Sequence, residues 1–255
     1  MKIAVCIKQV ASTNGPLQLD VGAGWLREAD TAFETNAADS HALEAGLAIR
    51  DRLGGEVLVV SLGPDRVTAV LRDALAKGAE RAIHVVREDA HKLDPAQVAE
   101  ALAAVLREEG CELILCGLQS DDVGHGQTGA LLAECLGWPL VGIVAALEVE
   151  TPHKVRARRE LEAGWSQWVE LPPPCVLTIQ SGINKPRYAG MKGMLAAKKK
   201  PITRVEPQFA GGMRNQQVIE QIYFPHRAKQ TRLLEGAPAD AAAQLVALLN
   251  LRGVQ

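Results

Sequence analysis

The chain has 255 residues, 47% of them hydrophobic and only 4% aromatic, which allows one sizeable core of aliphatic side chains. Its formal net charge is −2, so the composition predicts no overall attraction to nucleic acid or to an acidic membrane. No apolar run reaches the length of a membrane span, and the run in the N-terminal MKIAVCIKQV is too short for a signal peptide. The cysteines are scattered in apolar runs without a CxxC pair, which indicates reduced thiols in a cytoplasmic protein: Cys6, Cys111, Cys116, Cys135 and Cys175.

Up to about residue 150, short β-branched apolar runs alternate with longer stretches in which apolar residues recur every three or four positions. The short runs predict strands at Lys2–Ile7, Val57–Ser61, Ala82–Val86 and Glu112–Cys116. The longer stretches predict helices at Ser40–Leu53, Asp65–Lys77, Pro95–Glu109 and Gln127–Leu136. This alternation predicts an α/β fold: a doubly wound, mostly parallel, Rossmann-like sheet with helices on both faces.

From about Ala145 the pattern changes to approximate strand alternation with a charged face, and Ala163-Gly164 predicts a hairpin turn between two strands. Pro172–Pro174 precede a further buried strand, predicted at Cys175–Gln180. After Gly182 the chain is rich in Gly, Pro and Lys, and no apolar period predicts a packed element until the last stretch.

The chain is expected to end in a C-terminal extended arm with an amphipathic terminal helix at Pro238–Leu251. An arm of roughly 70 residues with a single helix is uncommon inside a compact domain, so we expect it to lie on a partner protein. The apolar face that the helix would present consists of Leu245, Val246, Leu248, Leu249 and Leu251.

Two junctions between a strand and a helix have the character of phosphate-binding loops. One follows the strand at Val57–Ser61, and the other is the Gly-rich stretch Gly117–Gly129. Ligands of parallel sheets bind at the carboxyl ends of the strands, where glycines and the free N–H groups of a helix N-terminus stabilise a phosphate. A single loop of this kind is more often structural, but two at one sheet edge favour a nucleotide site.

Neither loop contains GxGxxG or GxxxxGK[ST], and the second loop carries Asp121 and Asp122 with no Lys or Arg next to it in the sequence. We therefore expect no basic side chain beside this loop. A ribose with a single phosphate then fits better than ATP, because a triphosphate would face like charges.

Candidate catalytic chemistry is sparse. The six histidines are dispersed without metal-ligand spacing, His84 is interpreted as a core or edge histidine, and His125 lies in the Gly-rich loop. Cys6 ends the first strand, and we interpret it as a small buried thiol near an adenine pocket and not as a nucleophile. The chain is predicted not to be an enzyme by itself.

Blocks along the whole chain resemble, in order and spacing, the beta subunits of electron transfer flavoproteins. The most specific are VRARRELEAGWSQWVELPPPCVLT at Val155–Thr178 and GINKPRYAGMKGMLAAKKKP at Gly182–Pro201. Upstream, NAAD at Asn36–Asp39, SLGPDRV and GLQSDDVGHGQTG occupy the positions of further family blocks. The chain most resembles the bacterial members that serve amine-type dehydrogenases.

The resemblance implies a heterodimer in which an alpha subunit holds most of one redox-active FAD. The beta subunit of most members buries a structural AMP, so the first domain is expected to be an adenine nucleotide-binding domain. Carried over by position, the AMP contacts are Cys6, Asn36, Ala37, Ala38, Asp39, Leu62, Gly117, Gln119, Ser120, Asp121, Asp122, Val123, Gly124, His125, Gly126, Gln127 and Thr128. The position that approaches the flavin in some members falls near Thr13, where this chain carries nothing distinctive.

The resemblance also implies three parts: an α/β AMP-binding domain at 1–182, a partner recognition loop at 183–201, and an arm at 202–255 that packs on the alpha subunit. Met191 falls at the apolar anchor position of the loop. The expected docking residues are Arg187, Tyr188, Met191, Met194, Lys198, Lys199 and Lys200. Electrons would pass from an acyl-CoA or amine-type dehydrogenase through the heterodimer to a membrane quinone reductase.

Three alternatives remain at this point. In flavin-bifurcating members of the family a second FAD replaces AMP, but their loop resembles DGDTAQVGP, which GHGQTG does not, and this favours AMP. An adenine-nucleotide-dependent enzyme of related fold would need a pyrophosphate or triphosphate loop, and neither motif is present. A scaffold without a ligand would hold no nucleotide.

Overall fold

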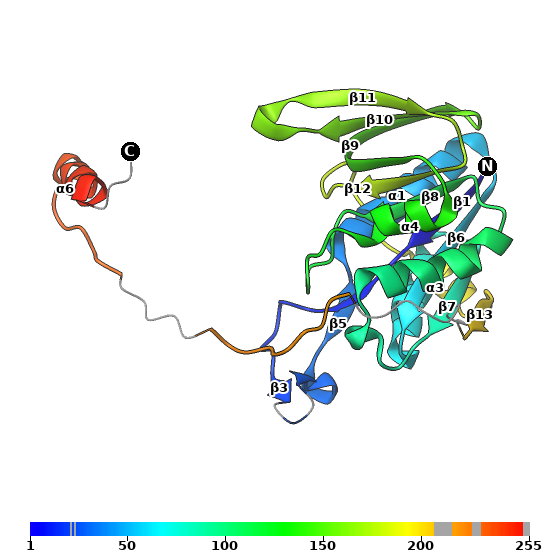
Figure 1. Cartoon of the computed structure of the whole chain (residues 1–255), viewed down its shortest axis with the longest axis horizontal. Helices are drawn as coiled ribbons and strands as arrows, with labels where there is room; N and C mark the ends of the chain where they lie inside the picture. The colour runs from blue at the N-terminus through cyan, green and yellow to red at the C-terminus, as the bar shows by residue number, and fades with distance from the viewer. Residues whose placement is uncertain (21, 23, 207–215, 226–230, 252–255) are drawn as a thin grey trace. The chain divides into compact units, whose positions relative to one another are not determined.

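The computed structural model describes residues 1–20, 22, 24–206, 216–225 and 231–251 (Figure 1). The chain forms two compact units, Met1–Gln221 and Ile222–Gln255. The first unit contains the whole sheet and every helix except the last. No helix among the described residues is both long and apolar enough to span a membrane.

A nine-stranded sheet forms the centre of the first unit, in the order β11-β10-β9-β12-β8-β1-β6-β7-β13. The strands from β9 to β13 along this order pair in parallel, and β10 and β11 extend the sheet as an antiparallel hairpin. In chain order the strands are β1 Lys2–Cys6, β6 Glu56–Gly63, β7 Arg81–Val86, β8 Leu113–Gly117, β9 Leu140–Thr151, β10 Lys154–Glu160, β11 Ser166–Leu171, β12 Cys175–Ile179 and β13 Ile202–Val205.

Helices cover both faces of this sheet, as the alternation of apolar runs predicts (Figure 1). Ile3 and Val5 of β1 pack into one core, and Ala4 and Cys6 pack into the other, because successive side chains of a strand point to opposite faces. The first core is covered by α1 Ala37–Leu53, α2 Thr68–Lys77 and α5 Met191–Ala197. The second is covered by α3 Pro95–Glu108 and α4 Thr128–Leu136. The predicted doubly wound α/β fold is confirmed.

Smaller elements surround the sheet. Between β1 and α1 the chain makes an excursion with two short ladders, in which β2 Gln9–Ala11 pairs with β5 Phe33–Thr35 and β3 Leu19–Asp20 pairs with β4 Trp25–Leu26. The 3₁₀ turns are η1 Glu28–Asp30, η2 Asp65–Val67, η3 Ala90–Lys92 and η4 Glu162–Gly164. The predicted hairpin turn at Ala163-Gly164 is confirmed, because η4 joins β10 to β11 and both residues have positive φ.

The prediction that no element packs between Gly182 and the terminal helix is wrong. Helix α5 packs on α2 so closely that a Cβ on Gly193 would lie 2.2 Å from the carbonyl oxygen of Ala76. Strand β13 adds to the edge of the sheet beside β7. Sequence patterns missed both because α5 packs through glycine and alanine, and because β13 has only four residues, of which only Ile202 and Val205 pack against the cores.

The second unit contains α6 Pro238–Leu251, which confirms the predicted terminal helix. Leu245, Val246 and Leu249 are exposed as expected, whereas Leu248 is half-buried. The side chain of Leu251 lies outside the described residues.

Candidate functional site

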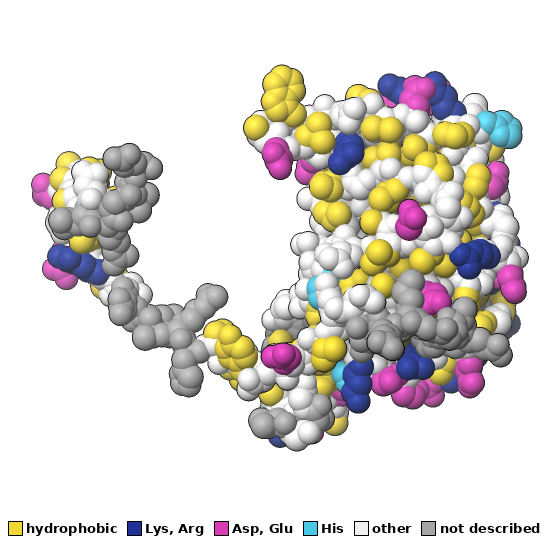
Figure 2. All heavy atoms as spheres, viewed as in Figure 1, with side chains coloured by type: hydrophobic (Ala, Val, Ile, Leu, Met, Phe, Trp, Pro, Cys, Tyr) yellow, Lys and Arg dark blue, Asp and Glu magenta, His cyan; other side chains and the backbone are white. Residues whose placement is uncertain are grey.

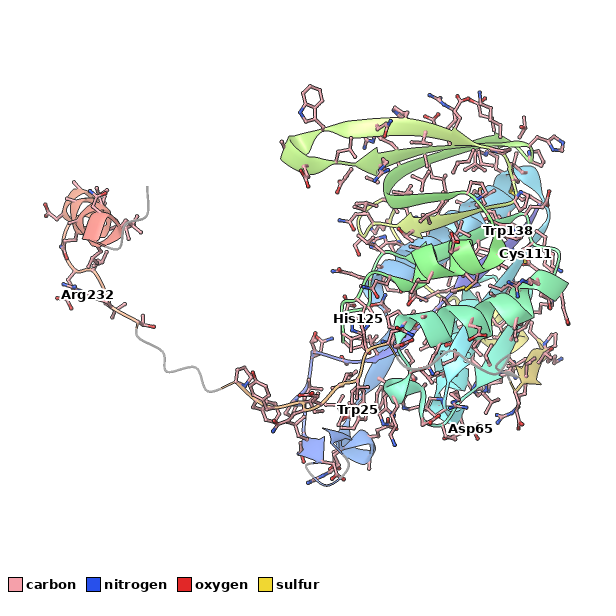
Figure 3. The ribbon with its side chains drawn as sticks, viewed as in Figure 1. Trp25, Asp65, Cys111, His125, Trp138 and Arg232 are labelled. Carbon is pink, nitrogen blue, oxygen red and sulfur yellow. The ribbon has the colours of Figure 1, made fainter. Side chains whose placement is uncertain are left out.

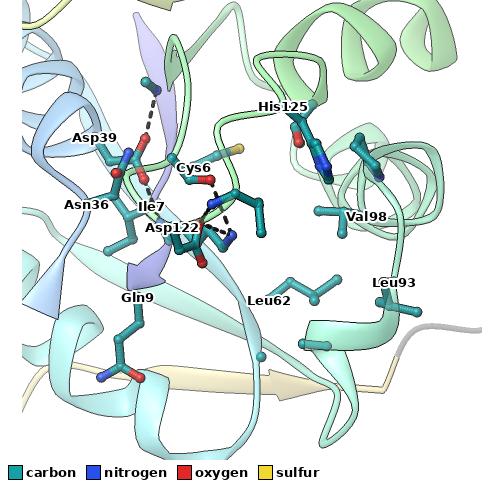
Figure 4. A pocket seen from close by; sticks show the side chains of 18 of the residues that line it. Cys6, Ile7, Gln9, Asn36, Asp39, Leu62, Leu93, Val98, Asp122 and His125 are labelled. Atoms are coloured by element: carbon teal, nitrogen blue, oxygen red, sulfur yellow. Dashed lines mark hydrogen bonds and ion pairs between the residues drawn. The ribbon is translucent and has the colours of Figure 1, made fainter. Parts of the chain in front are cut away.

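The two loops predicted to bind phosphate lie at the edge of one cleft, at the carboxyl ends of β8, β1 and β6 (Figure 4). The chain order reverses here, because β6 follows β1 on one side and β8 lies on the other side of β1. Such a switch point is where open parallel sheets bind their ligands. The empty space of the cleft, with the open solvent at its mouth included, is about 1230 Å³.

One wall of the cleft is polar and the other is apolar. Figure 4 shows Asn36, Asp39 and Asp122 on one side, and Leu93 and Val98 opposite them. Trp25, stacked on His91 with 4.9 Å between the ring centroids, and His125 also line the cleft (Figure 3). A ligand with an apolar aromatic part and a hydroxylated or charged part matches these two walls.

Asp39 joins two of the strand ends. Its carboxylate accepts the backbone N–H of Lys8, just after β1, at 2.7 Å, and the N–H of Gly117, at the end of β8, at 2.9 Å. The side chain is almost fully buried, and burial raises its pKa to about 7 although both N–H groups favour the charged form. Asp39 therefore fixes the spacing of β1 and β8 at the floor of the cleft.

Asn36 holds the Gly-rich loop in the same way. Its amide nitrogen donates to the carbonyl oxygen of Gln119 at 2.9 Å, and its amide oxygen accepts the N–H of Asp121 at 2.9 Å. The carboxylate of Asp121 in turn accepts the N–H of Ala37 at 3.1 Å, so it binds an otherwise free donor at the start of α1. The loop and the helix N-terminus therefore hold each other in place.

The expectation that no basic side chain lies beside the loop is wrong. The Lys8 ammonium lies 2.7 Å from a carboxylate oxygen of Asp122 and 3.4 Å from the hydroxyl of Ser120. Burial would raise the pKa of Asp122, but the Lys8 charge lowers it below its ordinary value. Lys8 is more than a hundred residues from the loop in sequence, and only the pairing of β1 with β8 brings it there.

Arg66 is a second cation of the cleft that sequence analysis missed. It forms an ion pair with Glu28 at 2.8 Å, donates to the side chain of Gln9 at 2.8 Å, and lies 4.0 Å from the centre of the Phe33 ring. These contacts tie the excursion between β1 and α1 to the start of α2.

Cys6 and Cys116 are paired neighbours on β1 and β8, and both line the cleft. The contact with the Cys116 thiol and burial together raise the pKa of Cys6 well above its ordinary value. A thiol in this state is a poor nucleophile, which agrees with its interpretation as a small buried group. No group of three or more metal-ligating side chains occurs in the described part of the chain.

Most of the residues expected to contact AMP do line the cleft: Cys6, Asn36, Asp39, Leu62, Gly117, Gln119, Ser120, Asp122, Val123, His125, Gly126, Gln127 and Thr128. Ala37, Ala38, Asp121 and Gly124 are not among the lining residues. Lining residues that sequence analysis missed include Lys8, Gln9, Trp25, Arg66, His91, Leu93, Val98 and Ile219. Lys8 and Gln9 had an available signal, since they directly follow the strand beside the switch point, and so did Arg66, which follows the junction after β6. The others lie in elements that no loop motif marks, among them Trp25 in β4 and Val98 in α3.

The expected docking residues fall into two groups. Tyr188, Met191 and Met194 are 91%, 77% and 49% exposed, and Lys198 and Lys199 are exposed as well. Arg187 and Lys200 are bound within the chain. On the face of the molecule in Figure 2, basic and acidic side chains are interspersed.

Arg187 and Lys200 tie the segment at Gly182–Pro201 to α1 and α2 within the first unit. The Arg187 guanidinium forms ion pairs with Glu44 at 2.8 Å and with Asp51 at 2.9 Å, both on α1. The Lys200 ammonium donates to the carbonyl oxygens of Leu75, at 3.1 Å, and of Ala79, near the end of α2. These two residues position the segment, and the side chains of the other five stay exposed.

The fold and the cleft define an α/β protein with a ligand site at the switch point of a doubly wound sheet. Residues 24–210 match the electron transfer flavoprotein domain. The chain is 35% identical to the electron transfer flavoprotein subunit beta of Methylophilus methylotrophus, over 98% of both chains, and 28% identical to that of Bacillus subtilis, again over 98% of both. The subunit beta of Bradyrhizobium diazoefficiens is 36% identical over 79% of this chain and 80% of its own length.

The chain belongs to the electron transfer flavoprotein family, among its beta subunits, which confirms the resemblance found in the sequence. The beta subunits of this family are electron carriers and pair with an alpha subunit.

Proposed function

We propose that this chain holds a structural AMP in the cleft, completes the environment of an FAD held mainly by its alpha subunit, and docks donor dehydrogenases. The FAD would supply the redox chemistry, and electrons from an acyl-CoA or amine-type dehydrogenase would pass through it to a membrane quinone reductase and the respiratory chain. The observation that carries the proposal is the cleft at the switch point, where Asn36 and Asp39 fix the loop that opens α4. The five free thiols favour a cytoplasmic location.

The residues of the cleft fit an adenosine with one phosphate. Leu93 and Val98 provide an apolar wall for a base, and the loop before α4 adds backbone N–H groups at a helix N-terminus for a phosphate. Both cations of the cleft already have acidic partners, Lys8 with Asp122 and Arg66 with Glu28. Little unpaired positive charge is left to balance the longer phosphate chain of ATP.

The nucleotide content of the heterodimer tests this proposal. The chain is co-expressed with its alpha subunit, the purified complex is denatured, and the released nucleotides are separated by chromatography. We expect one FAD and one AMP per heterodimer. Two FAD per heterodimer would instead support the flavin-bifurcating alternative. One FAD with no second nucleotide would support a scaffold role for the beta chain. ATP turnover by the beta chain alone would support an adenine-nucleotide-dependent enzyme.

We further propose that Gly182–Pro201 docks the donor dehydrogenase and that α6 packs on the alpha subunit. Support for the first comes from the exposed side chains of Tyr188, Met191 and Met194 on a segment that Arg187 holds firmly to α1. A flexible thioether suits a surface that has to fit more than one partner. Support for the second comes from the exposed Leu245, Val246 and Leu249 of α6.

Replacing Met191 with alanine is expected to slow electron transfer from the native donor dehydrogenase by about tenfold, because a well-placed apolar anchor contributes 1–2 kcal/mol or more to an interface. FAD and AMP contents should stay unchanged. Stopped-flow measurement of flavin reduction by the donor provides the rate. The matched control is Leu161→Ala, which truncates another exposed apolar side chain, at the hairpin turn; equal rates in wild type and Met191→Ala would contradict the anchor role.

Stability should depend on pH through Asp39. Its pKa is raised from an ordinary 3.8 to about 7 in the folded chain, so between these values the unfolded chain is ionised while the folded chain keeps the proton. The contribution of Asp39 is therefore fully present below about pH 4 and is lost as the pH rises through 7. We expect the thermal midpoint of the wild type to fall from pH 5 to pH 8 more steeply than that of Asp39→Asn. Parallel pH profiles for the two proteins would contradict the raised pKa.

A further inference from the structure

A segment near the end of the first unit lies at the mouth of the nucleotide cleft. The segment is Gln216–Gln221, which we call the strap. Ile219 lines the cleft itself, and Gln217, Val218 and Ile219 together with His125 line an adjoining hollow. The far side of this hollow is formed by 91–94, just before α3. The strap therefore comes between the Gly-rich loop and the start of α3, beside the space assigned to the ligand.

Asp94 connects the strap to α3. It is the N-cap of this helix, where one carboxylate oxygen accepts the N–H of Gln97 at 2.9 Å in a capping box. The other oxygen accepts the N–H of Gln216, and the N–H of Gln217 also bonds to this carboxylate. Burial would raise the pKa of Asp94, but these backbone donors lower it, so the group is charged at neutral pH.

These hydrogen bonds attach the strap at a specific point, whereas burial contributes little to its attachment. The side chains of all six strap residues are exposed, with Val218 71% and Ile219 44% accessible. A segment with few buried apolar contacts opens at low free energy unless specific bonds hold it. Hydrogen bonds to a charged, buried acceptor are among the strong ones.

We propose that Asp94 latches the strap over the cleft, and that a bound nucleotide leaves only after the strap has been released. Asp94 is then a positioning residue, since it acts on the ligand through Ile219 and does not touch it. The inference rests on the proposed binding of AMP in this cleft. In this proposal the Asp94 carboxylate has two separate functions. One oxygen caps α3, and the other retains the ligand by holding the strap.

Two substitutions separate these functions. Asp94→Ser keeps a side-chain oxygen for the N–H of Gln97, since serine is a good N-cap, but its single short side chain does not reach both Gln97 and Gln216. Asp94→Ala removes the cap and the latch together. Val218→Ala is the matched control within the strap, because Val218 lines the adjoining hollow and not the cleft itself.

The experiment loads the heterodimer with tritiated AMP and follows its release into an excess of unlabelled AMP. We expect both Asp94 variants and Ile219→Ala to release AMP at least tenfold faster than the wild type and Val218→Ala. Only Asp94→Ala should also lower the thermal midpoint clearly. Release from Asp94→Ser at the wild-type rate would overturn the latch, whereas a wild-type heterodimer that retains no tritiated AMP would overturn the proposed function on which it rests.

Discussion

Replacing Asn36 with alanine is expected to destabilise the chain by about 3 kcal/mol and to remove AMP from the purified heterodimer. The amide of Asn36 is almost completely buried and bonds the carbonyl oxygen of Gln119 and the N–H of Asp121. Both bonds would be lost, at roughly 0.5–1.5 kcal/mol each, and truncating the buried Asn36 side chain would add the cost of a cavity. The loop that opens α4 would also lose its fixed position beside α1.

Urea unfolding of the isolated chain measures the stability, and chromatography of the denatured heterodimer measures the AMP. Asn14→Ala is the control, because it makes the same change at an exposed residue whose amide bonds only the neighbouring Ser12. It should leave both measurements unchanged. An Asn36→Ala heterodimer that retains a full equivalent of AMP would show that the loop does not need this amide.

Replacing Gly117 with alanine is expected to have an effect of similar size, about 3 kcal/mol, through overpacking. A Cβ at this position would lie 2.2 Å from a carboxylate oxygen of Asp39 and 2.8 Å from the Cβ of Ala38. To make room, β8 would have to move away from α1, and the bond between Asp39 and the N–H of Gly117 would break. The spacing of β1 and β8 at the floor of the cleft would then change, and the purified heterodimer would no longer contain AMP.

The control for this substitution is Gly15→Ala, because a Cβ on Gly15 would have no atom within 4 Å. Urea unfolding and nucleotide content are again the measurements. If Gly117→Ala matched Gly15→Ala in both, the close approach of α1 to β8 would not be required for the site.

Features of this molecule that depend on neighbouring residues in the sequence can be predicted, whereas features that depend on contacts between distant residues cannot. Strands such as β1 and helices such as α3 are predictable because their apolar periodicity is a local signal. The position of the cleft is predictable too, since parallel strands place their loops at one edge. The environment of the cleft is not, because the ion pair of Lys8 with Asp122 and the approach of Ile219 depend on contacts between distant parts of the chain.

Element α5 shows a different limit. The large apolar side chains of its sequence MKGMLAA, Met191, Met194 and Leu195, are exposed, and the helix packs on α2 through Gly193 and Ala197 instead. Arg72 then bonds the carbonyl oxygens of Ala197 and Lys200 and so closes its C-terminal end. Small residues that permit close packing look the same in a sequence as the small residues of a loop.

The central place of β1 in the sheet has a consequence for the synthesis of the chain. This strand is synthesised long before one of its two neighbours, β8, whose Leu113 pairs with Ile3. At roughly 5–20 residues per second, translation takes several seconds to reach β8 after β1 has formed. During that interval one edge of β1, whose Ile3–Cys6 are buried in the finished fold, has no partner, so the nascent chain needs protection from aggregation until the β8 region has been made.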